Sequence, residues 1–199
     1  LASKSFSKSI SLGEGDGVTY VALGYCYYMR QQFVSAENAY RMGILLFPES
    51  KNARNGLVNC LIETSRFNEA LALLDELLAK QPDDVICHRA RVHALQGLGR
   101  ERDAVVAMET LKRMGELKTQ DFLNLGDLYH NLNLHELSLQ NYQLAIDGKN
   151  KLSIHRYVRV ASILMNRGSY QNCFLYLEKI QQIFGSNYNA QDEKEVLLL

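Results

Sequence analysis

The chain has 199 residues, and its 22 Lys and Arg are balanced by 22 Asp and Glu, so the formal net charge is zero. This balance argues against bulk binding to nucleic acid or to an anionic membrane surface. No apolar run is long enough to span a bilayer, and the first residues lack the apolar core of a signal peptide.

A spacing of 34 residues runs through the sequence. Small residues keep this step at Ala2, Ala36, Ala70, Ala104 and Ser138. Bulkier residues keep it four positions later, at Phe6, Tyr40, Leu74, Met108 and Tyr142. Pro48 and Pro82 follow the same step. A fixed period of this length predicts an array of repeats, each burying its apolar face against the next.

The first full repeat is predicted over residues 17–50. A helix over 18–29 carries the apolar stripe Tyr20, Leu23, Gly24 and Tyr27, with the i, i+3, i+4, i+7 spacing of one helix face. A turn over 30–33 and a second helix follow, and Pro48 closes the unit.

Later repeats are predicted over 51–84, 85–118, 119–152 and 154–187, the last one starting a residue late because of an insertion in the turn 147–153. Residues 1–16 fit the second helix of an incomplete repeat, and 188–199 fit a capping helix that begins at Asn189. The whole chain, 1–199, is therefore expected to form a single repeat domain. Because it starts in mid-repeat and without Met, we expect it to be a piece of a longer protein.

These positions resemble the tetratricopeptide repeat motif over nearly the whole chain. The resemblance implies an all-α, right-handed solenoid of five full repeats, with a half repeat before them and a cap after them. The pattern is broken in the third repeat, where Arg91 stands at a place that expects Leu. Gly24 and Gly126 are expected to let the paired helices approach closely, and Ala36, Ala70 and Ala104 to lie where they touch.

In this family the first helix of each repeat lines a concave groove, and the resemblance implies ligand-facing positions there. The first repeat offers the apolar residues Val18, Val21, Tyr25, Tyr28 and Met29. They are either anchors for a partner or covered by the preceding helix. The second repeat offers Asn52, Asn55 and Asn59 on one helix face. These are either a ladder for an extended peptide or a solvated polar surface.

The later repeats offer Arg89, His93, Asn124, Asp127, His155 and Arg159. Most of this set is similar to the clamp by which some tetratricopeptide domains hold a C-terminal carboxylate, with Arg89 and His155 as donor-keeping substitutions. A general polar groove is the alternative. Asp127 would repel an acidic ligand or occupy an arginine.

Catalytic, cofactor and metal sites are not expected. Gly13–Gly17 resembles a phosphate loop but follows no strand and carries two acids. Asp127 and His130, with His93 and His155 on flanking repeats, lie too far apart for zinc. Cys26, Cys60, Cys87 and Cys173 are read as reduced thiols, which leans toward the cytoplasm.

The predicted function is that of a non-enzymatic scaffold or adaptor that binds a partner peptide or helix in the groove. Nucleic acid and membrane insertion are not expected. One alternative is a chaperone-like domain that clamps an acidic C-terminal tail, and another is a regulatory region of a larger enzyme or secretion assembly. Self-association is a further alternative, through apolar ends at Phe6 and Ile10 and at 196–199.

Overall fold

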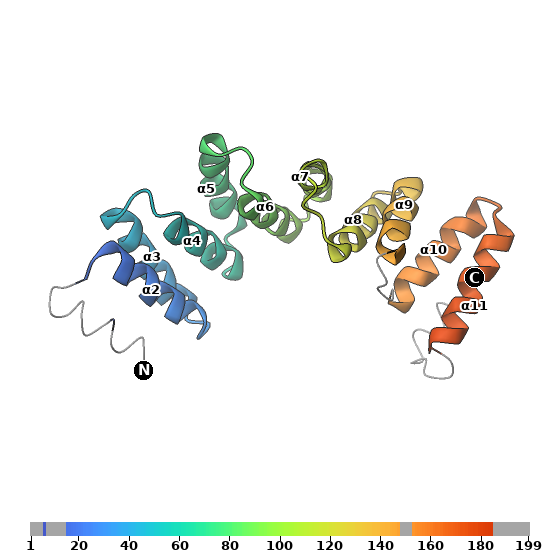
Figure 1. Ribbon diagram of the computed structural model, residues 1–199, viewed down its shortest axis with the longest axis horizontal. Coiled ribbons are helices and arrows are strands. Elements are labelled where there is room, and N and C mark those ends of the chain that lie inside the picture. Colours follow the sequence, from blue (N-terminus) through green and yellow to red (C-terminus); the bar gives the residue numbers. More distant parts are fainter. Residues whose placement is uncertain (1–5, 7–14, 148–152, 185–199) are drawn as a thin grey trace. The chain divides into compact units, whose positions relative to one another are not determined.

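The structure of the chain, a computed structural model, describes residues 6, 15–147 and 153–184 (Figure 1). Within these ranges it consists of α-helices and has no strand, which confirms the all-α class. The helices are α2 (Gly17–Tyr28), α3 (Phe33–Leu46), α4 (Lys51–Glu63), α5 (Phe67–Lys80), α6 (Val85–Gly97), α7 (Glu101–Arg113), α8 (Thr119–Asn131), α9 (His135–Asp147), α10 (Ile154–Asn166) and α11 (Tyr170–Phe184). None of these helices has the length and apolarity that a bilayer crossing requires.

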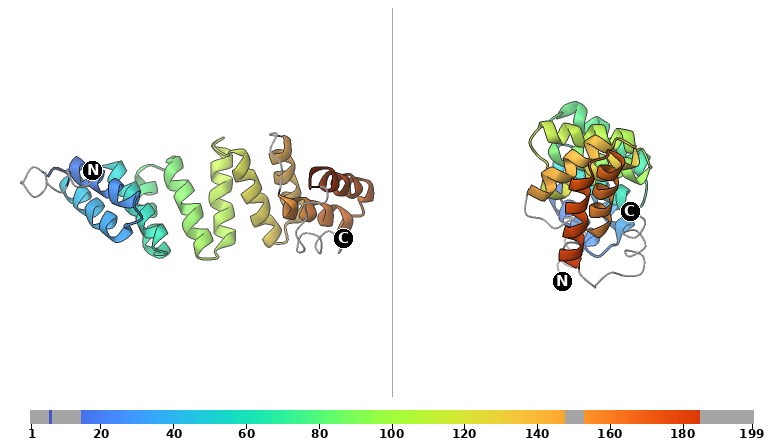
Figure 2. Two further views of the ribbon diagram at one scale, coloured as in Figure 1. Left: turned by 90° about the horizontal axis from the view of Figure 1, so that it is seen from below. Right: turned by 90° about the vertical axis from the view of Figure 1, so that its right-hand side faces the viewer.

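The chain divides into two compact units, one up to Met114 and the other from Gly115 on. In the first unit each helix from α2 to α7 packs against its neighbours in sequence. The first helices of consecutive hairpins also lie side by side there, α2 against α4 and α4 against α6. In the second unit α8 packs on α9, α9 on α10 and α10 on α11, again as helix hairpins (Figure 2).

Side-chain caps mark the starts of three first helices, and residues with positive φ mark the turns. Asp16, Ser50 and Asp84 precede α2, α4 and α6, and each side chain accepts a hydrogen bond from the backbone N–H three residues on. The turn inside each hairpin contains one residue with positive φ, and these residues are Gln31, Ser65, Gly99, Asn133 and Gly168. Capping and turn chemistry therefore recur with the sequence period.

Small residues make the close helix contacts. Ala36, Ala70, Ala104 and Ser138 are fully buried. A Cβ on Gly126 would lie 2.6 Å from the ring of Tyr142, and one on Gly24 would lie 2.8 Å from the ring of Tyr40. The close approach predicted at both glycines is confirmed.

Several expectations stay predictions. The segments 1–5, 7–14, 148–152 and 185–199 lie outside the described residues. They include most of the half repeat, the inserted turn, the capping helix and, apart from Phe6, the apolar ends invoked for self-association. The repeat count and the single domain over 1–199 also stay predictions.

Candidate functional site

Two of the three predicted apolar contact residues at the end of α2 are exposed. The side chain of Tyr25 is 58% exposed and that of Met29 is 63% exposed. Tyr28 is instead half-buried: its hydroxyl donates to Oε1 of Glu63 at 3.2 Å, and its ring meets Phe33 edge-on. Burial and the Glu63 carboxylate raise the pKa of Tyr28. Tyr25 and Met29 are thus presented to solvent, while Tyr28 is held by its neighbours.

The three asparagines lie along α4, between α2 and α6. Asn52 and Asn59 are exposed, and Asn55 is half-buried with the Sγ of Cys87 3.9 Å from its Oδ1. On α6, Arg89 is half-buried and His93 is exposed. Since α4 packs beside both α2 and α6, the first unit gathers the predicted residues of three repeats on three neighbouring helices. We call the exposed side of α2, α4 and α6 that carries them the first-helix face.

The second unit places its predicted residues differently, because Asp127 is the centre of a polar cluster. Its carboxylate accepts from the hydroxyl of Tyr142 at 2.7 Å, from Nη1 of Arg159 at 2.7 Å and from Nε of Arg156 at 3.0 Å. The hydrogen bonds tie α8 to both α9 and α10. Asn124 accepts from the side chain of Gln120 at 3.1 Å, and His155 is exposed.

Electrostatics at this cluster favour a neutral imidazole. Burial lowers the pKa of His130, and the positive charge of Arg159 and the nearby His135 lower it further. The Nδ1 atom of His130 is buried and has no hydrogen-bond partner within the described residues. Burial and the hydrogen bond to Asp127 raise the pKa of Tyr142 to about 12. Both groups are therefore uncharged at neutral pH.

Arg156 was missed by sequence reasoning, although it contacts Asp127 as closely as Arg159 does. The available signal was its spacing: three residues before Arg159, it lies on the same face of α10. The sequence analysis did predict that Asp127 could pair with an arginine, and in the structure it pairs with Arg159.

The described part of the chain offers little for catalysis or metal binding. No group of three or more His, Cys, Asp or Glu side chains there is placed to hold a metal ion. All four cysteines are free, and burial raises the pKa of Cys60 to about 12 and that of Cys87 to about 11. Such thiols are poor nucleophiles.

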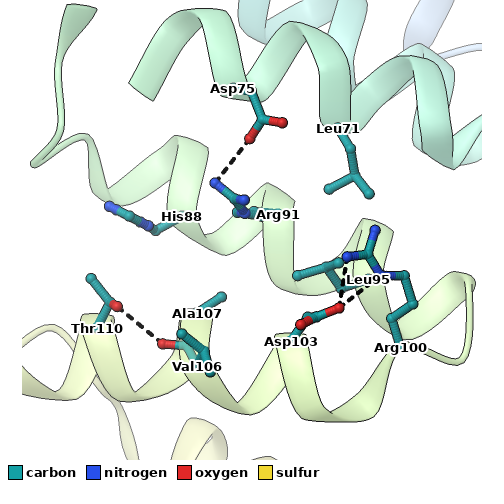
Figure 3. Close-up of a pocket in the computed structure, with 10 residues that line it drawn as sticks. All are labelled: Leu71, Asp75, His88, Arg91, Leu95, Arg100, Asp103, Val106, Ala107 and Thr110. Atoms are coloured by element: carbon teal, nitrogen blue, oxygen red, sulfur yellow. Dashed lines mark hydrogen bonds and ion pairs between the residues drawn. The ribbon is translucent and has the colours of Figure 1, made fainter. Parts of the chain in front are cut away.

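Two cavities that sequence reasoning did not predict lie between second helices of the first unit. One, of about 410 Å³, lies between α3 and α5 over α4, and we call it the α3/α5 groove. The other, of about 340 Å³, lies between α5 and α7 over α6, and we call it the α5/α7 cavity (Figure 3). Several of their lining residues occupy the same positions of consecutive repeats: Arg41 and Asp75, Arg54 and His88, Leu57 and Arg91.

Comparison with known proteins agrees with this architecture. Residues 27–99 match the family model described as tetratricopeptide repeat. No curated protein matches the sequence. Among solved structures, Pseudomonas aeruginosa PilF is 14% identical with a TM-score of 0.73, and the match covers 97% of this chain and 86% of that one.

Two further solved structures show the same fold. MamA from Desulfovibrio magneticus is 13% identical with a TM-score of 0.73, over 88% of this chain and 99% of that one. YrrB, described as a tetratricopeptide repeat protein with an unusual peptide-binding site, is 14% identical with a TM-score of 0.73, over 98% and 97%. These structures show that the chain has the helical fold of tetratricopeptide repeat proteins, and residues 27–99 match that family's model.

Proposed function

We propose that the chain binds an extended segment of a partner protein on the first-helix face of its first unit. The fold and the family support the coarser statement that the chain is a protein–protein interaction scaffold, since repeats of this family are typically non-catalytic interaction modules. YrrB, with its peptide-binding site, is a parallel for the class of partner.

The observation that carries the proposal is the asparagine series on α4. Asn52 and Asn59 are seven residues apart, which corresponds to about 10 Å along a helix. An extended peptide advances about 3.3 Å per residue, so the series spans about three peptide groups. Each Asn amide can both donate to and accept from a peptide group. Asn52 and Asn59 are exposed, so they are open to a partner.

Neighbouring side chains extend this surface on both sides. Tyr25 on α2 and Met29, directly after α2, provide exposed apolar area, and a rigid amphipathic Tyr ring is a frequent anchor in protein interfaces. Arg89 and His93 on α6 provide donors on the other side. The surface therefore combines anchors for side chains with hydrogen-bonding groups for a peptide backbone.

The carboxylate clamp is less well supported, because it needs Arg159 to bind the ligand. That guanidinium already donates to Asp127, and Asn124 already accepts from Gln120. A ligand carboxylate would have to compete with Asp127 for the guanidinium of Arg159, and the negative charge of Asp127 would repel it. We therefore favour binding of an extended peptide over the carboxylate clamp.

The test is binding to a pooled library of short peptides, prepared with free and with amidated C-termini. We expect peptides of both kinds to bind, and Asn52→Ala/Asn59→Ala to abolish binding. Asn38→Ala/Asn68→Ala, which removes two exposed asparagines from second helices, is the matched control and should bind as the wild type does. Binding restricted to free C-termini and lost in Arg159→Ala would overturn the proposal in favour of the clamp.

A further inference from the structure

We propose that the α3/α5 groove is a second binding site, which takes an apolar side chain from an acidic segment of another protein. The site is built from second helices and from α4, so it does not depend on the first-helix face. Three features support it: its apolar lining, the positive charge around it and the different chemistry of the equivalent cavity one repeat later.

The lining of the groove is mainly aliphatic. Leu57, 7% exposed, comes from α4 beneath the groove, and Leu73 and Leu77 come from α5. Ile44 and Leu45 come from α3, and the side chain of Leu45 is 71% exposed. A volume of about 410 Å³ falls within the range of cavities that hold ligands. The groove can therefore bury a large apolar side chain.

Positive charge dominates the polar part of the lining. Arg41, Arg54 and Lys80 line the groove together with one acidic side chain, Glu76. The acidic partners of the arginines do not line the groove. Arg41 contacts Glu37, which Arg66 also binds while pairing with Glu69, and exposed Glu49 lies 4.0 Å from Arg54. An apolar anchor flanked by acidic residues is the complementary ligand.

Further exposed apolar side chains lie on α3. Val34 is 68% exposed, Leu46 is 49% exposed and Met42 is 38% exposed. At 1.5 Å per residue Met42, Leu45 and Leu46 lie together at the end of α3, whereas Val34 is about 16 Å away along the helix, with exposed Asn38 and Arg41 between. The exposed apolar surface beside the groove is therefore that of Met42, Leu45 and Leu46, and such a surface with a charged rim is typical of a protein interaction site.

The α5/α7 cavity shows that the fold alone does not produce this chemistry (Figure 3). At the equivalent positions it has Asp75 in place of Arg41, His88 in place of Arg54 and Arg91 in place of Leu57. Nη1 of Arg91 lies 3.0 Å from Oδ1 of Asp75, so an ion pair occupies the place of the aliphatic floor. The α5/α7 cavity is thus a built-in comparison for the α3/α5 groove.

The test uses two labelled peptide pools, one with a central Leu or Phe flanked by Glu and one with Lys in place of each Glu. Binding is measured by fluorescence anisotropy. We expect the Glu pool to bind more tightly than the Lys pool, with an affinity that falls as salt is added. Leu45→Glu should weaken binding at least about tenfold. Val106→Glu, an equally exposed position that lines the α5/α7 cavity, should leave it unchanged.

Circular dichroism of each variant checks that the helices persist. The proposal is overturned if the Glu pool binds no more tightly than the Lys pool, or if Leu45→Glu binds as the wild type does. Loss of Glu-pool binding in Asn52→Ala/Asn59→Ala would assign the peptides to the first-helix face instead. Wild-type dimers that dissociate in Leu45→Glu on ultracentrifugation would make a second copy of the chain the occupant, which also contradicts it.

Discussion

At Ala70 the side chain is fully buried on α5, whereas Ala72, two residues further on, is exposed. Ala70→Leu is expected to lower the free energy of unfolding by about 1–3 kcal/mol, because added methyl groups force tightly packed helices apart. Ala72→Leu adds the same group to the same helix and should change the free energy of unfolding by less than about 0.5 kcal/mol. Urea denaturation of both variants measures the difference. Equal effects would show that helix propensity, and not packing, controls the result.

Arg91 illustrates a side chain that departs from its repeat. The equivalent Leu57 and Leu125 are buried, whereas the Arg91 side chain is 37% exposed and paired with a more exposed Asp75. Such an ion pair contributes between about 0 and 1 kcal/mol. Burying a Leu side chain contributes about 1.5–3 kcal/mol.

Arg91→Leu is therefore expected to raise the free energy of unfolding by about 1 kcal/mol. The expected gain is smaller than the free energy of burying a whole Leu side chain, because part of the side chain at this position stays exposed. Thermal and urea unfolding measure it, with Asp75→Asn as the control that removes only the ion pair. If Arg91→Leu lowers stability by more than Asp75→Asn does, the arginine contributes contacts beyond that pair.

At the scale of the helix, the cap at Asp84 has a neighbour that serves as its control. The Asp84 side chain accepts from the backbone N–H of Cys87 at 3.0 Å, whereas Asp83 is exposed and carries the same charge. Asp84→Ala should lower the free energy of unfolding by about 0.5–2 kcal/mol, because the backbone N–H of Cys87 at the helix start loses its hydrogen-bond acceptor. Asp83→Ala should have little effect in the same urea titration. Similar losses in both variants would mean that charge near the α6 start, and not capping, stabilises it.

Helix positions were predictable because the signals that start and pack a helix are local and recur. Asp84 stands 34 residues after Ser50, and the helices α4 and α6 begin directly after these residues. The cluster at Asp127 was predicted only in part. The spacing puts Arg156 on the same face of α10 as Arg159, but which of these arginines reaches Asp127 depends on how α10 is rotated against α8.

The α3/α5 groove and the α5/α7 cavity were not predictable for a related reason. Each is lined by residues from three helices, such as Arg41, Leu57 and Leu73, and their juxtaposition depends on the spacing between second helices. The period does reveal equivalent positions, such as Leu57 and Arg91. It does not reveal that these positions face a cavity.

At the scale of the whole chain, the two compact units differ in the chemistry that holds them. The first unit contains Glu37, a buried carboxylate whose pKa burial would raise but which hydrogen bonds from Arg41 and Arg66 lower on balance. The second unit contains the Asp127 cluster and His130, whose pKa is lowered by burial and by Arg159. These groups titrate in different pH ranges, so we expect the units to respond differently to acid.

A His with a lowered folded-state pKa binds fewer protons in the folded state than in the unfolded state. Its contribution to stability is complete above the unfolded value of 6.5 and is lost as the pH falls below it. A carboxylate with a lowered pKa loses its contribution only below the ordinary value of 4.5. Mild acid should therefore weaken the second unit before the first.

Between about pH 7.5 and about pH 5.5, amide signals from α8–α10 should disappear at lower urea concentrations as the pH falls, while those from α4–α6 stay nearly constant. Two-dimensional NMR of the whole chain during a urea titration separates the two sets. His130→Gln should remove most of the pH dependence of α8–α10, whereas His155→Gln, at an exposed position, should preserve it. If the pH dependence survives in His130→Gln, or if α4–α6 respond equally, the acid response does not originate at the buried imidazole. The two units would then not be distinguished by the groups that titrate within them.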